Sequence, residues 1–316
     1  MAQTPNGFGI SLKMQENMCL LGQSQVFEDG EYLLKSLMGI NMSAKQIQRV
    51  SECYGSMIEN KEQELIKKEE GMKMKKDNSL TYVMPDGSMV FTREEGWKEI
   101  KVGRIFSAAN IINLQPNRKH IAESLYVCHL GTHTDFLDKM EHHIERYTQK
   151  ICIGDGAVWI WNWATDRYPK MIQILDLFHA LEKLGEFART QYIDPKERKK
   201  WTEKQKKLLL TDQVVKVIKN TTGLKARTEE AQKAKDNLIG YYTNNQTRMM
   251  YGTYKDKGYL VGSGAIESAH RNVVQQRLKL SGQRWSKSGA QQIVNLRAYQ
   301  KSNRWKEVVD FIKNAA

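Results

Sequence analysis

The stretch ICIGDGAVWIWNW, residues 151–163, decides the fold of this chain. It begins as an apolar strand, from Ile151 to Ile153, and then reaches an acid, Asp155, between two glycines. A carboxylate at the tip of a core strand is energetically costly unless a partner compensates it. The residues after the acid are typical of a helix. This order of strand, acidic turn and helix predicts an α/β sheet with a functional acid at its carboxyl edge.

The spacing of apolar residues on both sides of this stretch predicts a mixed sheet of five strands. Residues 80–91, 97–106 and 124–130 are typical of strands that pair as a meander, with Gly96 in the first turn. A helix follows, then the strand before Asp155, a helix, a fifth strand (MIQILDLF) and another helix. The last two strands need right-handed crossovers onto the same sheet. The expected fold class is therefore α/β with the strand order of the RNase H-like fold, in which the first and fourth strands are neighbours.

The expected catalytic core is interrupted by a helical segment. Residues 80–190 form the first part of this core, and residues 258–316 add its last helix and a basic tail. Between them, residues 191–257 are polar and almost all helix-forming. We therefore expect an all-helical insertion at 191–257.

The N-terminal region, residues 1–55, is expected to be a small helical DNA-binding region. Residues 27–55 show two helical patterns joined by a short turn, and Ser43 can cap the second helix. This is the layout of a helix-turn-helix, whose second helix enters the major groove, although an ordinary helical hairpin has the same pattern. The charge-dense residues 56–79 then resemble an exposed helical linker. The polar side chains of the second helix that we expect to contact DNA are Lys45, Gln46 and Arg49.

Two further acids are candidates to join Asp155. Asp86 lies on the first expected strand, and Glu267 lies in the first turn of an expected helix that Ser263 or Gly264 caps. Two carboxylates about 4 Å apart repel by roughly 4 kcal/mol at an effective dielectric of 20, so such a pair indicates a bound cation. Oxygen ligands alone select hard ions, Mg²⁺ or Mn²⁺. The alternatives are a turn at PDGS for Asp86 and compensation of the helix dipole for Glu267.

The charge of the chain indicates a polyanionic partner. The formal net charge is +13, and beyond Glu267 the only acids are Glu307 and Asp310. Clustered positive charge is typical of nucleic-acid binding, although it can serve solubility alone. Four widely spaced cysteines without a CxxC pair argue against a zinc site or a disulfide framework. The C-terminal residues that we expect to contact DNA are Arg271, Arg277, Lys279, Arg284, Lys287 and, as a residue that stacks on an unpaired base, Trp285.

Three blocks of the sequence together resemble one family. They are MPDGSMVFTREEGWKEIKVGRIF, GDGAVWIWNWATDRYPKMIQILDLFHALEKL and GSGAIESAHRNVVQQRLKLSGQRWS. In this order they resemble the bacterial insertion-sequence transposases of the DDE type, the ISKra group. The resemblance implies that Asp86, Asp155 and Glu267 are the catalytic metal ligands. It also covers DLFHA, where Asp176 would lie next to the active edge and His179 could reach a phosphate or the attacking water, the alternative for His179 being a supporting or core role.

The resemblance implies a Mg²⁺- or Mn²⁺-dependent transposase that cuts double-stranded DNA at transposon ends and joins the 3′-hydroxyl to target DNA. We expect it to act as a homodimer or larger assembly on DNA, because two ends must be joined. With no apolar run long enough to span a bilayer, we expect a cytoplasmic, nucleoid-associated protein. Two alternatives stay open: a nuclease or resolvase of the same fold that only hydrolyses, and a DNA-binding repressor derived from a transposase.

Overall fold

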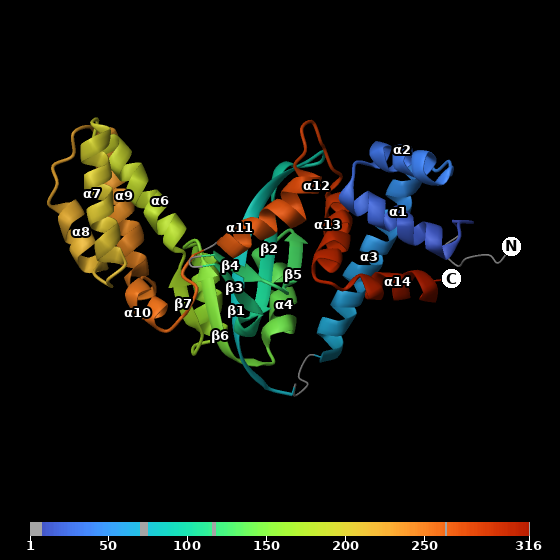
Figure 1. The fold of residues 1–316 in the computed structure, drawn as a ribbon, viewed down its shortest axis with the longest axis horizontal. Helices are drawn as coiled ribbons and strands as arrows, with labels where there is room; N and C mark the ends of the chain where they lie inside the picture. The colour runs from blue at the N-terminus through green and yellow to red at the C-terminus, as the bar shows by residue number, and fades with distance from the viewer. Residues whose placement is uncertain (1–7, 70–74, 116–117, 263, 316) are drawn as a thin grey trace. The chain divides into compact units, whose positions relative to one another are not determined.

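A computed structural model of the chain describes residues 8–69, 75–115, 118–262 and 264–315 (Figure 1). Contacts divide the chain into two compact units, the first formed by Met1–Thr148 with Ala265–Ala316 and the second by Gln149–Gly264. Across the described ranges, none of the helices combines the length and the apolar character needed to cross a membrane.

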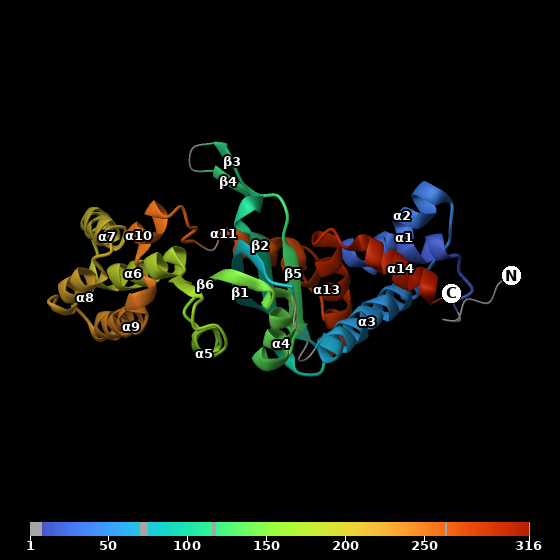
Figure 2. The ribbon, with the colours of Figure 1, turned by 90° about the horizontal axis from the view of Figure 1, so that it is seen from below.

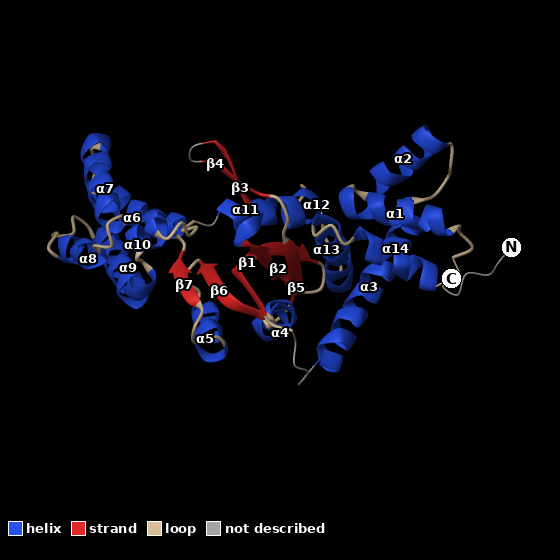
Figure 3. Cartoon of the chain, turned by 60° about the horizontal axis from the view of Figure 1, so that its bottom comes forward, coloured by secondary structure: helices blue, strands red, loops and turns tan. Residues whose placement is uncertain are grey.

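The fold is α/β, with a mixed five-stranded sheet in the order β5-β2-β1-β6-β7 (Figure 3). β1 pairs antiparallel with β2, β2 pairs antiparallel with β5, and β6 pairs parallel with β7. The expected class and the expected neighbourhood of the first and fourth strands are confirmed, while the RNase H-like assignment stays a prediction. The strands are β1 Asp77–Thr92, β2 Gly96–Ser107, β5 Leu125–Leu130, β6 Tyr147–Gly154 and β7 Ile172–Leu175.

The β1–β2 hairpin is built by an unbroken antiparallel ladder. It turns just before Gly96, whose φ of +70° suits glycine, and the Thr92 hydroxyl donates to the Gly96 carbonyl at 2.9 Å. The expected turn residue is therefore confirmed. The alternative of a turn at PDGS is wrong, because Asp86 pairs with Val102 inside the ladder. Cross-strand pairing overrides the local turn preference of Asp-Gly there.

A second hairpin in the first unit was not expected from the sequence. Its strands, β3 Ile111–Gln115 and β4 Arg118–Ile121, form a separate two-stranded sheet that projects from β2 and β5 (Figure 2). Ile112 and Leu114 are exposed on it. Because the hairpin buries little apolar surface, its sequence lacks the alternation that marks a strand lying on a core.

In the first unit, the N-terminal helices pack against the long helix α3, Ala44–Glu69. Its Ile47, Val50 and Tyr54 are buried, and Ile58 continues the same apolar stripe. The helix expected from residue 56 is confirmed as far as Glu69, and most of its side chains there are exposed or half-buried. Two residues pack instead, because Ile58 is buried and Glu59 binds Lys139 at 2.7 Å. The other helices of this unit are α1 Leu12–Ser24, α2 Phe27–Met38, α4 His133–Ile144, α11 Gly264–Ala269, α12 Gln276–Leu278, α13 Lys287–Lys301 and α14 Trp305–Asn314.

The turn between α2 and α3 follows the sequence closely. The Gln46 amide donates to the Ser43 hydroxyl at 3.3 Å, and the Ser43 amide donates to the Gln46 side chain at 2.9 Å. This capping box confirms Ser43 as the cap of α3. Leu37, at 77% exposure, and Met38 do not face the core of this unit.

Helices dominate the second unit, as expected for residues 191–257 (Figure 3). The side chains of Trp161 and Trp163 on α5 are buried. β7 is shorter than the expected fifth strand, because Asp176 begins a helix instead. The helices are α5 Val158–Arg167, α6 Leu177–Gln191, α7 Pro195–Leu209, α8 Val214–Thr222, α9 Glu229–Asn245 and α10 Tyr251–Asp256.

A glycine on α3 permits its close contact with α13. A Cβ atom at Gly55 would lie 2.2 Å from the backbone oxygen of Gln292. No rotamer change can relieve a clash with backbone, so the two helices would have to separate.

We predict that Gly55→Ala lowers the free energy of unfolding by about 1–3 kcal/mol, the usual penalty of overpacking. Gly240→Ala is the matched control, because Gly240 lies in the middle of α9 with no atom within 4 Å of an added Cβ. The control should gain about 0.5–1 kcal/mol from the better helix former. Urea denaturation followed by circular dichroism measures both. Equal effects of the two substitutions would contradict the close α3–α13 contact.

Candidate functional site

Asp86 lies in the middle of β1 and is partly accessible. Its Oδ1 atom accepts a hydrogen bond from the Gly87 amide at 2.7 Å. Its Oδ2 atom lies 3.0 Å from Nε2 of His270, and the Asp86 side chain keeps 21% of its surface exposed. The carboxylate therefore has one oxygen fixed by the backbone and one directed at an imidazole.

The helix that carries Glu267 lies over β2 in the first unit (Figure 1). Glu267 lies in the first turn of α11, as expected, while Ser263, one of its two expected caps, lies outside the described residues. Arg104 of β2 anchors this turn, because its guanidinium donates to the Ala265 carbonyl at 2.6 Å and to the Ser124 hydroxyl at 2.9 Å. The expected third acid thus sits on an element tied directly to the sheet.

After α11 the helix continues as a π-helical segment, His270–Gln275, and then as α12. Such segments are rare and are frequent at functional sites, because the wider turn redirects side chains. Here the first residue of the segment is His270, which contacts Asp86. The contact brings the Glu267 helix beside β1, although the two segments are far apart in sequence.

His270 is the residue that the sequence analysis missed. It is buried, and neither ring nitrogen has a hydrogen-bond partner, since the contact with Asp86 lacks hydrogen-bond geometry. A buried polar group without a partner is destabilising, by about 1–3 kcal/mol. Its spacing from Glu267, three residues on a helix, was the available signal, because side chains at i and i+3 share a face.

Two expected DNA-binding residues, Arg277 and Trp285, are corrected by their burial. Arg277 is 1% exposed and donates to the Gly22 carbonyl at 2.9 Å. Its guanidinium lies 4.7 Å from the centroid of the Trp285 ring, which is 6% exposed and bonded to the Leu278 carbonyl. Burial lowers the pKa of Arg277 to about 10, which still leaves it charged near neutral pH. Both side chains hold the protein together and are inaccessible to DNA.

The other expected DNA contacts are exposed. Lys45, Gln46 and Arg49 lie on the outer face of α3, although Arg49 also lies 5.6 Å from the centroid of the Phe8 ring. These three side chains are accessible to solvent. The exposed basic residues that follow Glu267 in the expected set are Arg271, Lys279, Arg284 and Lys287, of which Lys287 pairs with Glu95 at 3.0 Å.

In the second unit, Asp155 sits in a turn that Tyr241 braces. The Asp155 Oδ1 atom accepts from the Ala157 amide at 3.0 Å, and its backbone oxygen accepts from the Tyr241 hydroxyl at 2.5 Å. Gly156 has a φ of +100°, and a Cβ there would lie 2.7 Å from the Tyr241 ring. Burial, followed by the charges of Asp155 and Asp176, raises the pKa of Tyr241 well above its ordinary value, so its hydroxyl stays a donor.

Asp176 and His179 form a hydrogen-bonded pair at the start of α6. The carboxylate is 1% exposed and caps the helix through the Phe178 and His179 amides at 3.1 and 3.0 Å. Its Oδ2 atom also accepts from His179 Nδ1 at 2.5 Å. The buried acid therefore orients the imidazole, so that Nε2 carries the lone pair of the neutral ring. In this geometry Asp176 orients the His179 ring, and His179 is the candidate for direct contact with a phosphate or with the attacking water.

The acids suit a hard divalent cation in their chemistry, since carboxylate oxygens are the ligands that Mg²⁺ and Mn²⁺ prefer. Within residues 8–69, 75–115, 118–262 and 264–315, no three His, Cys, Asp or Glu side chains gather in a form that could hold a metal. The expected ligands are divided between the units, with Asp86 and Glu267 in the first and Asp155 in the second. Metal binding by these acids stays a prediction.

Comparison with known proteins gives no relative, because neither the protein-family models nor the curated proteins contain a match to this chain.

We predict that His270→Leu leaves the free energy of unfolding unchanged or raises it by about 1 kcal/mol, because the lost group has no hydrogen bond to lose. Urea denaturation measures the change. The matched variant is Arg297→Leu, since buried Arg297 donates to the Gln23 and Val273 carbonyls at 2.5 and 2.6 Å. That variant should lose more than about 2 kcal/mol. If His270→Leu strongly lowered the free energy of unfolding, the histidine would have a structural role, and the prediction would be wrong.

Proposed function

We propose that the chain is a metal-dependent DNA transposase that cuts phosphodiesters at transposon ends and joins the freed 3′-hydroxyl to target DNA. The proposal draws on the three sequence blocks of the DDE type. The single structural observation that supports it is the contact between Asp86 and His270 at 3.0 Å. It brings the helix of Glu267 beside the strand of Asp86, and the buried imidazole there has no role in folding that its bonds reveal.

Asp86, Asp155 and Glu267 would hold the metal ions. When bound there, Mg²⁺ or Mn²⁺ would activate the attacking oxygen and stabilise the leaving oxygen of a phosphodiester. The residues of the chain prepare this chemistry by fixing carboxylates in advance. The Gly87 amide holds one oxygen of Asp86, and the Ala157 amide holds one oxygen of Asp155.

His179 would act as a polar group toward the substrate. Asp176 fixes its ring through Nδ1 at 2.5 Å, which presents the other nitrogen in one defined orientation. Such a nitrogen can accept a proton from water and, once protonated, donate to a phosphate oxygen. The buried acid stabilises the protonated imidazole when it forms.

The exposed basic residues would bind the DNA backbone. Lys279 reaches the β1 strand itself, with its Nζ atom 3.4 Å from the Ser88 hydroxyl, two residues from Asp86. A phosphate near Asp86 would therefore meet a cation. The face of α3 with Lys45, Gln46 and Arg49 would bind duplex DNA, and a dimer or larger assembly would hold two ends together.

We predict that Glu267→Gln reduces strand cleavage by more than about 100-fold while binding of the transposon end changes less than about twofold, because the amide loses the charge that attracts a divalent cation. The readouts are cleavage of a labelled DNA end with Mg²⁺ or Mn²⁺ and a gel-shift assay. Glu230→Gln is the matched control, since Glu230 is exposed in the first turn of α9. Unchanged cleavage by Glu267→Gln would refute the assignment.

A strand-transfer assay with pre-cut ends separates the rival functions. Joining of the 3′-hydroxyl to target DNA supports a transposase, whereas cleavage without joining identifies a nuclease or resolvase. Specific DNA binding without nicking in the presence of Mg²⁺ identifies a repressor.

A further inference from the structure

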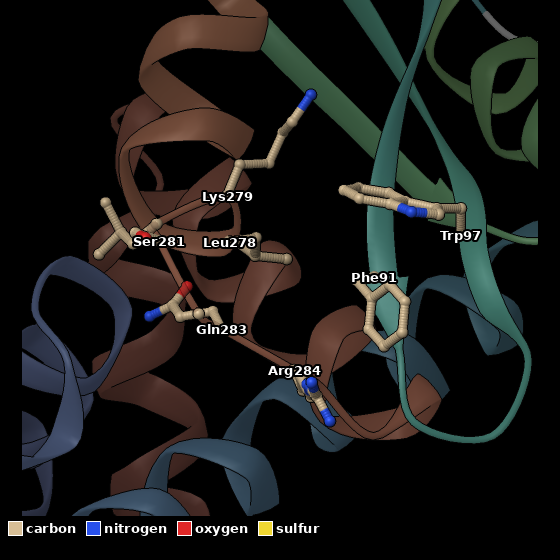
Figure 4. A pocket seen from close by; sticks show the side chains of 9 residues that line it. Phe91, Trp97, Leu278, Lys279, Ser281, Gln283 and Arg284 are labelled. Carbon is tan, nitrogen blue, oxygen red and sulfur yellow. The ribbon is translucent and has the colours of Figure 1, made fainter.

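A pocket of about 380 Å³ lies in the first unit at the end of the β1–β2 hairpin (Figure 4). One wall is the chain segment from Leu278 to Arg284, and the other is formed by Phe91 and Trp97. Its volume lies within the range of about 300–1,000 Å³ that small-ligand sites show.

The aromatic wall of this pocket is unusually accessible. Trp97 is 62% exposed, and its Cα pairs across the hairpin with that of Phe91. The two rings meet edge to face at 5.5 Å between centroids, with 87° between their planes. Phe91 therefore fixes one edge of the indole and leaves much of its surface in solvent. Figure 4 shows the Trp97 ring extending over the space opposite Leu278.

Cations border the same space. The Arg284 guanidinium lies 5.8 Å from the centroid of the Phe91 ring, and the exposed Lys279 extends from the opposite wall. Both acids of the hairpin tip are already engaged. Glu94 accepts from the Lys287 amide at 3.0 Å, and Glu95 binds Lys98 at 2.6 Å and the Lys287 side chain at 3.0 Å. The pocket thus combines a flat apolar surface with positive charge that no acid of that tip neutralises.

We infer that this pocket binds one unpaired nucleotide of the DNA, with the base stacked on Trp97 and the flanking phosphates bound by Lys279 and Arg284. Every base presents a π-face to an exposed aromatic ring, and basic side chains beside the ring hold the backbone. Trp97 thereby takes the stacking role that the sequence analysis gave to Trp285, which is buried.

The inference rests on the proposed function for the source of the nucleotide. Phe91 lies five residues along β1 from Asp86, which is about 17 Å at roughly 3.4 Å per residue. That distance is about five base-pair steps of B-form DNA at roughly 3.4 Å per step. Because the two positions are an odd number of residues apart on an unbroken ladder, their side chains lie on opposite faces of the hairpin, and the DNA would pass around its edge between them.

The test is a binding titration with a duplex that carries one unpaired 2-aminopurine, in EDTA so that no cleavage can occur. Stacking on Trp97 should quench the 2-aminopurine fluorescence when the wild-type chain binds. Trp97→Ala should abolish the quenching and weaken binding roughly tenfold, whereas Trp97→Phe should keep part of both. The control is Ile193→Ala, at a residue 76% exposed in the second unit, which should bind like the wild type.

A fully paired duplex of the same sequence gives the second comparison. Wild type and Trp97→Ala should bind it with the same affinity, because it offers no base for the pocket. The inference would be overturned if Trp97→Ala lost the same affinity for both duplexes. It would also be overturned if this variant quenched the 2-aminopurine fluorescence as strongly as the wild type. Quenching by the Glu267→Gln variant should match the wild type, so failure of the pocket and failure of the proposed chemistry are distinguishable.

Discussion

The arrangement of the first unit depends on arginines buried among backbone carbonyls. Arg297 of α13 donates to Gln23 at the end of α1 and to Asn272 and Val273 of the π-helical segment. Arg277, which lies one helical turn after Val273, donates to the Gly22 carbonyl of α1. Helix ends and π-helical turns leave carbonyl oxygens without helical partners, and a guanidinium can satisfy several of them at once. Removing one such arginine would leave these oxygens buried and unpaired, so the helix of Glu267 and the N-terminal helices depend on each other.

This constraint fixes the position of the candidate site. Arg104 holds the first turn of the Glu267 helix to β2, and Arg297 holds its π-helical segment to α13. Between these two anchors, His270 reaches Asp86 without a hydrogen bond of its own. The surrounding bonds thus hold in place an imidazole whose polar contact is with Asp86. A group kept in such an unfavourable state is more consistent with a function than with stability.

The positive charge of the C-terminal segment serves two different purposes. Arg277 and Arg297 are interior, and burial lowers the pKa of each to about 10 without neutralising it at physiological pH. Lys279 and Arg284 are exposed beside the pocket of Phe91 and Trp97. The same division applies to the tryptophans, since Trp285 packs against Arg277 while Trp97 faces solvent. Net charge and composition therefore do not identify the residues that would meet the proposed polyanionic partner.

The sequence by itself determined the features that depend on neighbouring residues. The five strands of the mixed sheet, the helices that connect them up to α6, the cap at Ser43 and the turn at Gly96 follow from period, capping and backbone preference, which act over a few residues. The β3–β4 hairpin does not. Only the tertiary structure decided what PDGS, Arg277, Trp285 and His270 do. Asp86 is in a strand because β2 pairs with it, and His270 matters because the chain returns to Asp86 after 184 residues. Burial and unsatisfied polar groups are properties of those distant pairings, and no local pattern encodes them.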